Sequence, residues 1–122
     1  MTTPERAGRE GDSQPLPTAS DSPYIHDLVA AEIQGLDDPI MLAIAADLEA
    51  RKTLGIKRYG QPLQAFNGRN PILDAYEEAL DLLVYTRQAL YEAESTERYS
   101  PIHDAYKHAL VLVQILKEAL SA

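Results

Sequence analysis

The chain has 122 residues, which is room for one domain. Its 19 acidic residues against 11 basic ones give a formal net charge of -8, which disfavours binding to the phosphates of nucleic acid. The sequence contains no cysteine, which excludes disulfides and cysteine nucleophiles, and no apolar run approaches the roughly 20 residues that cross a bilayer. The N-terminus also lacks the apolar segment of a signal peptide, so we expect a cytoplasmic protein with no membrane partner.

The first 22 residues differ in composition from the rest of the chain. They are rich in Pro, Gly, Ser and Thr and hold almost no large apolar side chain. Such a segment cannot bury enough surface to offset the entropy lost on ordering. The sequence therefore predicts a disordered tail over residues 1–22 and a folded domain over residues 23–122.

Four predicted helix starts share one pattern, a capping side chain followed by a proline. They are Ser22-Pro23, Asp38-Pro39, Asn70-Pro71 and Ser100-Pro101. Gly35 and Gly55 stand where the first two helices are expected to end in a left-handed residue. The predicted spans are about 23–34, 39–54, 71–95 and 101–120, and no segment alternates as a half-buried strand does. We expect an all-α fold, a four-helix bundle.

The apolar faces of the helices predict how they pack. The stripe expected on the first helix holds Ile25, Leu28, Val29, Glu32 and Leu36. The stripe expected on the last helix holds Ile102, Ala105, Ala109, Val113 and Leu116, widened by Leu112 and Ile115. The second helix is apolar around most of its circumference, which in so small a chain favours a second subunit. We therefore expect a homo-oligomer, either a dimer or a tetramer.

The third predicted helix carries a stripe of carboxylates. At about 100° per residue, Asp74, Glu78 and Asp81 fall within roughly 60° of one another, and Glu77 flanks them. No basic residue lies between Asp74 and Arg87 to offset their repulsion. Clustered carboxylates are the oxygen ligands that Mg²⁺ or Mn²⁺ prefers, whereas the alternative interpretation is a solvated acidic face.

The run Glu77-Glu78-Ala-Leu-Asp81-Leu-Leu resembles the E-E-L-G-D-L-L signature of the MazG-like, all-α nucleoside triphosphate pyrophosphohydrolases. In that family an E-E-x-x-E helix precedes an E-x-x-D helix, and both bind magnesium. Residues 47–90 are also similar to short phage-encoded members, which carry comparable Lys/Arg-Tyr-Gly, Asn-Gly-Arg and Asp-Ala-Tyr-x-Glu-Ala-Leu-Asp elements. One branch of these, MazZ, converts dGTP to dGMP, so the resemblance favours dGTP as substrate.

The first half of the family's metal motif is missing from this sequence. No E-E-x-x-E occurs before residue 77, and the nearest carboxylates are Asp47 and Glu49 on the second helix. Two positions apart, they point about 160° away from each other on a regular helix. Glu32 is a third candidate because it falls in the predicted apolar stripe, where it could instead pair with Arg51 or Lys57.

A basic loop of about 15 residues is expected between the second and third helices. It holds Lys57, Arg58 and Arg69, which would bind a polyphosphate, the arginines as bidentate forks. Tyr59 or Phe66 could stack on a base, and Asn67 could read its edge, but both rings could equally be core residues and Asn67-Gly68 a turn. Lys57 and Arg58 could also offset the dipole of the preceding helix.

These features together predict a metal-dependent pyrophosphohydrolase that converts a nucleoside triphosphate and water to a nucleoside monophosphate and pyrophosphate. Asp47, Glu49, Glu78 and Asp81 are the candidate metal ligands, and Glu77 or Asp74 would position or deprotonate the attacking water. The substrate-binding candidates are Lys57, Arg58, Tyr59, Asn67 and Arg69. The alternative function is a non-catalytic helical interaction module with a solvated acidic face.

Overall fold

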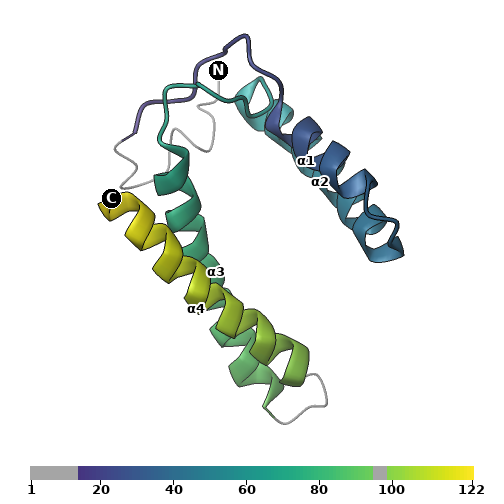
Figure 1. Cartoon of the computed structure of the whole chain (residues 1–122), viewed down its shortest axis with the longest axis vertical. Helices are drawn as coiled ribbons and strands as arrows, with labels where there is room; N and C mark the ends of the chain where they lie inside the picture. Colours follow the sequence, from purple (N-terminus) through teal and green to yellow (C-terminus); the bar gives the residue numbers. More distant parts are fainter. Residues whose placement is uncertain (1–13, 95–98) are drawn as a thin grey trace. The chain divides into compact units, whose positions relative to one another are not determined.

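The computed structural model describes residues 14–94 and 99–122 and confirms the all-helical prediction for them. The helices are α1 (Ile25–Gln34), α2 (Pro39–Tyr59), α3 (Pro71–Ala93) and α4 (Tyr99–Ser121), and no strand occurs within the described ranges (Figure 1). The chain divides into two compact units, Met1–Arg69 and Asn70–Ala122. Within the described residues, no helix is both long and apolar enough to cross a membrane.

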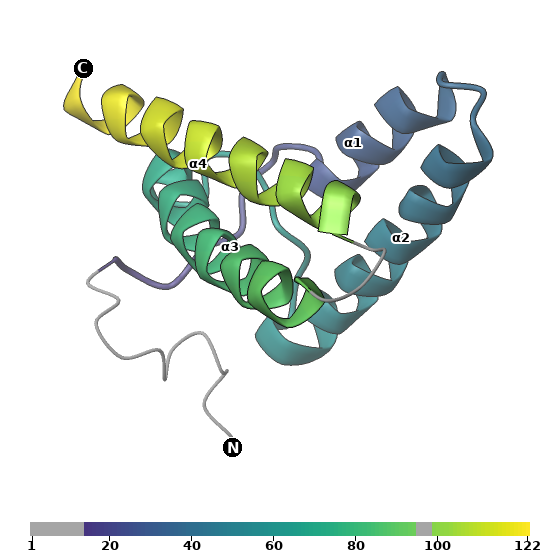
Figure 2. The same cartoon turned by 90° about the horizontal axis from the view of Figure 1, so that it is seen from below.

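In the first unit, α1 packs against one side of α2 (Figure 2). The side of α2 that is half-buried follows helical spacing and consists of Met41, Ala45, Leu48, Lys52, Gly55 and Tyr59. On α1 the half-buried residues are Ile25, His26, Val29, Ala30 and Ile33. The predicted α1 stripe was therefore partly wrong, since Leu28, Glu32 and Leu36 are exposed. An exposed Glu32 needs no buried partner, which removes the reason for expecting a pairing with Arg51 or Lys57.

Helix α2 keeps much of its apolar surface exposed. Ile40 is 70% exposed, Leu42 54% and Ile44 38%, and no residue of α2 is fully buried. One neighbouring helix covers only one side of a helix that is apolar around most of its circumference. The exposed side chains match the surface from which the sequence predicts a homo-oligomer.

Two of the four predicted helix starts are confirmed in detail. The Asp38 carboxylate accepts from the amide of Ile40 at 2.8 Å, and the Asn70 side chain accepts from the amides of Ile72 and Leu73 at 3.0 and 3.2 Å. The other two starts were misplaced. Helix α1 begins after Tyr24 rather than at Pro23, and α4 begins at Tyr99, so Ser100-Pro101 lie inside its first turn.

Neither predicted glycine ends its helix in a left-handed conformation. Gly35 follows α1 with an ordinary φ of -74°, and Gly55 lies inside α2, which continues to Tyr59. The left-handed C-cap is Gly60, with φ 83°, and its amide donates to the Ile56 carbonyl. The extra turn places Tyr59, which is half-buried, on the same side of α2 as Lys52, seven residues earlier. Partial burial of that ring favours continuing the helix past the first glycine.

In the second unit, α3 and α4 form a hairpin with a seam of small side chains. Ala79, Leu90 and Ala93 of α3 and Ala109 of α4 are buried, and Ala109 is 0% exposed. Alanines at the contact let two helix backbones approach closely over their length. The predicted α4 stripe is largely confirmed, since Ala109 is buried and Ile102, Val113 and Leu116 are half-buried, but Ala105 is exposed, as are Leu112 (44%) and Ile115 (53%). Tyr106 takes the expected place of Ala105 and lies half-buried.

An extended segment precedes α1 and lies antiparallel to the loop after α2. The Thr18 amide donates to the Asn67 carbonyl at 2.8 Å, and the Ile25 amide donates to the Leu63 carbonyl at 2.9 Å. Between them, the Ser20 hydroxyl donates to the Ala65 carbonyl at 2.7 Å. Residues 14–22 belong to the tail that the sequence predicts to be disordered, which stays a prediction, and the structure describes these bonds for Thr18 and Ser20. The rest of that predicted tail, residues 1–13, lies outside the described residues.

Candidate functional site

The carboxylate stripe of α3 faces away from α4. Glu78 and Asp81 are exposed, and Asp74 and Glu77 are half-buried. The buried residues Ala79, Leu90 and Ala93 recur on the side of α3 that packs on α4. At about 100° per residue, Asp81 is turned about 160° from Ala79, so the stripe lies on the outer surface of the hairpin. Asn70 and Pro71 set this orientation because they fix where the helix begins.

The donor atoms of the stripe suit a hard divalent cation. Mg²⁺ keeps several waters and is commonly held by one or two carboxylates together with substrate phosphates. Glu78 and Asp81, three residues apart on adjacent turns, provide such a pair. Among the described residues, however, no group of three or more Asp, Glu or His side chains is gathered as a complete metal site. The stripe fits a cation that is shared with a bound phosphate rather than one enclosed by protein ligands.

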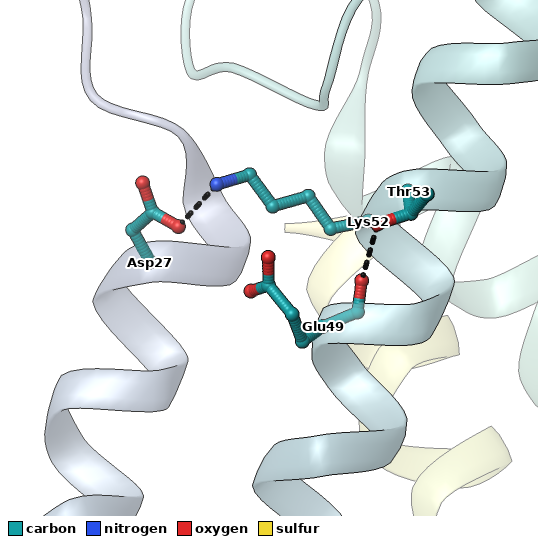
Figure 3. A network of polar contacts seen from close by, with 4 residues as sticks. All are labelled: Asp27, Glu49, Lys52 and Thr53. Carbon is teal, nitrogen blue, oxygen red and sulfur yellow. Dashed lines mark hydrogen bonds and ion pairs between the residues drawn. The ribbon is translucent and has the colours of Figure 1, made fainter.

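The candidate ligands of α2 lie in different surroundings (Figure 3). Asp47 and Glu49 are both exposed. Figure 3 shows Glu49 on the side of α2 from which Lys52 reaches toward α1. The Lys52 ammonium donates to the Asp27 carboxylate at 2.8 Å and lies over the Tyr24 ring at 5.3 Å. The α2 pair is therefore not gathered at one point, and one member has a lysine beside it.

The environment of Lys52 favours its charged form. The hydrogen bond from Lys52 to Asp27 raises the pKa of the lysine, partial desolvation opposes the rise, and the negative charges of Asp27 and Glu49 add to it. The Lys52 side chain is only 17% exposed, so this cation is held in place. A metal ion at Glu49 would be repelled by it, which makes Asp47 the better α2 candidate.

The predicted basic loop is shorter than expected because its first residues are helical. Lys57 and Arg58 lie exposed in the last turn of α2, where they offset the negative end of the helix dipole. Tyr59 is half-buried, so its ring is only partly accessible for stacking. Phe66 was predicted as either core or platform, and it is 89% exposed at a left-handed φ of 54°.

Asn67 and Arg69 are the two loop candidates that the structure ties down. Asn67 is 8% exposed, and its side-chain oxygen accepts from the Arg69 amide at 3.2 Å, which is an Asx turn. The Arg69 guanidinium donates to the Pro15 carbonyl at 2.7 Å. The turn interpretation of Asn67 is thus confirmed, and the same oxygen is not available to read a base edge.

Two polar groups of this region were not found by the sequence analysis. Gln64 binds the segment before α1 through its side-chain amide, and Lys52 joins α2 to α1. Gln64 and Ser20 are 44 residues apart, so no local pattern could pair them. The only available signal for Lys52 was a charge at a position that continues the half-buried spacing of α2.

A hollow of about 590 Å³ in the second unit begins further along α3. Its lining includes Leu83, Val84, Arg87 and Tyr106, and none of the four stripe carboxylates takes part. The stripe is therefore an open surface rather than the wall of a pocket in this unit.

Comparison with known proteins adds no assignment. No family model, no curated protein and no solved structure matches the chain. The likeness to the MazG-like enzymes consequently stands on the residues of this chain, those of the α3 motif and the similar elements within residues 47–90. Chemically, the described arrangement offers an outward row of carboxylates in one unit, and two exposed cations with a tethered arginine in the other.

Proposed function

We propose that the chain is a metal-dependent nucleoside triphosphate pyrophosphohydrolase of the MazG-like type. The observation that carries the proposal is the stripe Asp74, Glu77, Glu78 and Asp81, which lies on the outer surface of α3 without a basic residue among its members. Four like charges on adjacent turns destabilise a bare helix, and a divalent cation removes that repulsion. The E-E-x-x-D-L-L order of the same residues supports this particular chemistry.

Glu78 and Asp81 are the residues we assign to Mg²⁺ or Mn²⁺ on α3, with Asp47 as the favoured candidate on α2 and Glu49 as the weaker one. When bound, the cation supplies charge neutralisation for the phosphates and an acidified water. Glu77, or Asp74 in its place, orients the attacking water and takes up its proton. The new bond forms at the α-phosphorus while the bond to the bridging oxygen breaks, which yields a nucleoside monophosphate and pyrophosphate.

The cations of the first unit are assigned to the triphosphate. Lys57 and Arg58 are exposed and close together in the last turn of α2, which suits a flexible and highly charged ligand. Arg69 adds a bidentate fork once its contact with Pro15 is given up. Tyr59 and Asn67 are less suited to base recognition because the first is half-buried and the second forms a turn. Phe66 is the loop ring with the exposure that stacking needs.

The proposed enzyme is a homo-oligomer, either a dimer or a tetramer, with dGTP as the favoured substrate. The exposed apolar residues of α2, Ile40 and Leu42 among them, support the oligomer. The preference for dGTP comes from the resemblance to the MazZ branch, and the four deoxynucleotides are distinguished in the assay below.

The test is pyrophosphate release from each dNTP with Mn²⁺, with Mg²⁺ and with chelator. We expect metal-dependent release that Glu78→Gln or Asp81→Asn lowers by at least about 100-fold while helicity is retained. Glu92→Gln is the matched control, because Glu92 lies eleven residues after Asp81 and so on nearly the same side of α3. Full activity in either stripe variant contradicts the assignment.

The second candidate is a non-catalytic interaction module, which the open stripe and the exposed α2 surface favour. In that case the acidic surface is solvated, and the module gains no thermal stability from Mn²⁺ or Mg²⁺. An enzyme that binds the cation in its folded state is stabilised by it. Absence of turnover together with an unchanged melting temperature would favour the module.

A further inference from the structure

The segment of residues 15–22 lies across the loop that carries Arg69. Its contacts run antiparallel along the loop, from Pro15 opposite Arg69, through Thr18 opposite Asn67, to Ser20 opposite Ala65. The Thr18 hydroxyl adds a second bond to the Asn67 carbonyl at 3.2 Å. We call residues 15–22 the strap. All its partners belong to the same compact unit.

One side chain attaches the end of the strap that leads into α1. The Gln64 amide accepts from the Ser20 amide at 3.2 Å and donates to the Ser20 carbonyl at 2.8 Å, as a neighbouring strand would. The same nitrogen donates to the Ser22 carbonyl at 2.8 Å. Three bonds from one side chain to the backbone of a segment 42 to 44 residues away make Gln64 the main attachment of residues 20–22, while Thr18 and Pro15 are held by Asn67 and Arg69.

The strap occupies one hydrogen-bond donor of the loop that a phosphate ligand would use. The Arg69 guanidinium donates to the neutral carbonyl of Pro15 at 2.7 Å. A carbonyl is a weaker partner for arginine than a phosphate oxygen, which accepts a charge-assisted and bidentate pair. The contact is therefore one that a polyphosphate can displace.

We propose that the strap is an autoinhibitory element, which must leave Arg69 before a polyphosphate binds there. The inference rests on the proposed function in one respect, the assignment of Arg69 to the triphosphate. A ligand that binds only the strap-open state has an apparent affinity reduced by the fraction of molecules that are open. Weakening the strap therefore tightens polyphosphate binding, without any new contact to the ligand.

The test compares full-length wild type with Gln64→Leu, which keeps the side-chain size and removes its three hydrogen bonds. Gln34→Leu, an exposed glutamine at the end of α1, is the matched control. Inorganic tripolyphosphate is titrated calorimetrically, and amide hydrogen exchange is followed at Thr18 and at Leu73. We expect faster exchange at Thr18 only, and an apparent Kd for tripolyphosphate that falls about 5-fold or more in Gln64→Leu.

Unchanged exchange at Thr18, or equal or weaker tripolyphosphate binding when exchange is faster, overturns the proposal. Ser20→Ala, which loses the bond to the Ala65 carbonyl and the bond from the Ser22 amide at 3.3 Å, gives the same test in a milder form if Gln64→Leu alters the helix content. Tighter tripolyphosphate binding without hydrolysis of any dNTP would support the strap and contradict the pyrophosphohydrolase. Turnover with identical tripolyphosphate affinity in both proteins would do the reverse.

Discussion

Each of the two units of the chain is stabilised by a different kind of contact. In α3 and α4 the contact is apolar, with Ala79, Leu90, Ala93 and Ala109 buried in one seam. In the first unit neither α1 nor α2 has a buried residue. Its helices meet through half-buried side chains, and polar contacts also connect its parts: Lys52 joins α2 to α1, and Gln64 joins the strap to the loop. A net intramolecular hydrogen bond contributes only about 1 kcal/mol, so the first unit is the one that can open locally.

The second unit therefore serves as a fixed scaffold, whereas the first unit contains contacts that can be exchanged. The α3 stripe needs a fixed helix, because its carboxylates share one surface only while the helical spacing is kept. The loop of Arg69 has to exchange the Pro15 carbonyl for a phosphate. Hydrogen bonds permit such an exchange, whereas buried apolar contacts do not. The following predictions test the contrast, from the largest effect to the smallest.

Placing a charge in the apolar seam should have the largest effect. Ala109→Glu puts a carboxylate at a position that is 0% exposed and without a cationic partner, and we expect it to lower the free energy of unfolding by about 3 kcal/mol or more. Ala105→Glu, four residues earlier and exposed, should change it by less than about 0.5 kcal/mol. Thermal or urea unfolding measures both, and similar losses would contradict the seam.

The two glycines of α2 should respond in opposite directions. Gly60→Ala forces a side chain into the left-handed region at φ 83° and should cost about 1 kcal/mol. Gly55→Ala lies inside the helix, where an added Cβ meets nothing within 4 Å, and should stabilise by roughly 0.5–1 kcal/mol. If the helix ended at Gly55 instead, Gly55→Ala would destabilise.

The two helix caps, Asp38 in the first unit and Asn70 in the second, should contribute about equally to the free energy of unfolding. Removing the capping oxygen in Asp38→Ala or in Asn70→Ala should cost about 1 kcal/mol each. Asp37→Ala, next to the α2 cap, is the control and should be close to neutral. Amide exchange assigns each loss, since Asp38→Ala should expose amides of α2 and Asn70→Ala those of α3. Losses spread over both units in each variant would contradict their independence.

The Lys52–Asp27 pair should give the smallest effect, visible in alkaline solution. The pKa of Lys52 is raised above its ordinary value of 10.5, so its stabilisation is present below that pH and is lost as the pH rises through the raised pKa. We expect wild type to lose stability above about pH 10.5 by slightly more than Asp27→Asn does. Melting temperatures from pH 8 to 11.5 measure the difference, and parallel curves would contradict the pairing.

The helices were predictable from sequence where their signals are local. Asp38-Pro39 and Asn70-Pro71 mark helix starts because the cap and the proline act within three residues. Gly55 was misleading because a single glycine costs a helix interior only about 1 kcal/mol, and α2 continues to the left-handed Gly60 instead. The strap was missed because Gln64 and Ser20 are 44 residues apart and polar segments look alike whether ordered or not.

The candidate site, like the helices, was predictable from sequence only where its signals are local. Helical spacing placed Glu78 and Asp81 on one exposed surface of α3, as the structure has them. Glu49 and Lys52 are three residues apart, so helical spacing already puts them on one side of α2, and Asn67-Gly68 already indicates a turn. Local spacing could not foresee that Lys52 bonds Asp27 of α1, or that Arg69 bonds the Pro15 carbonyl. Those two contacts depend on tertiary structure rather than on the spacing of residues along one helix.

The most direct test of the account is a titration of Mn²⁺ followed by electron paramagnetic resonance, in the presence of a non-hydrolysable triphosphate analogue. Wild type, Asp81→Asn and the control Glu92→Gln are compared at equal concentration. The account predicts a bound-Mn²⁺ signal in wild type and Glu92→Gln that is lost in Asp81→Asn. Equal binding in all three proteins, or none in wild type, would contradict the claim that the α3 stripe is a metal site.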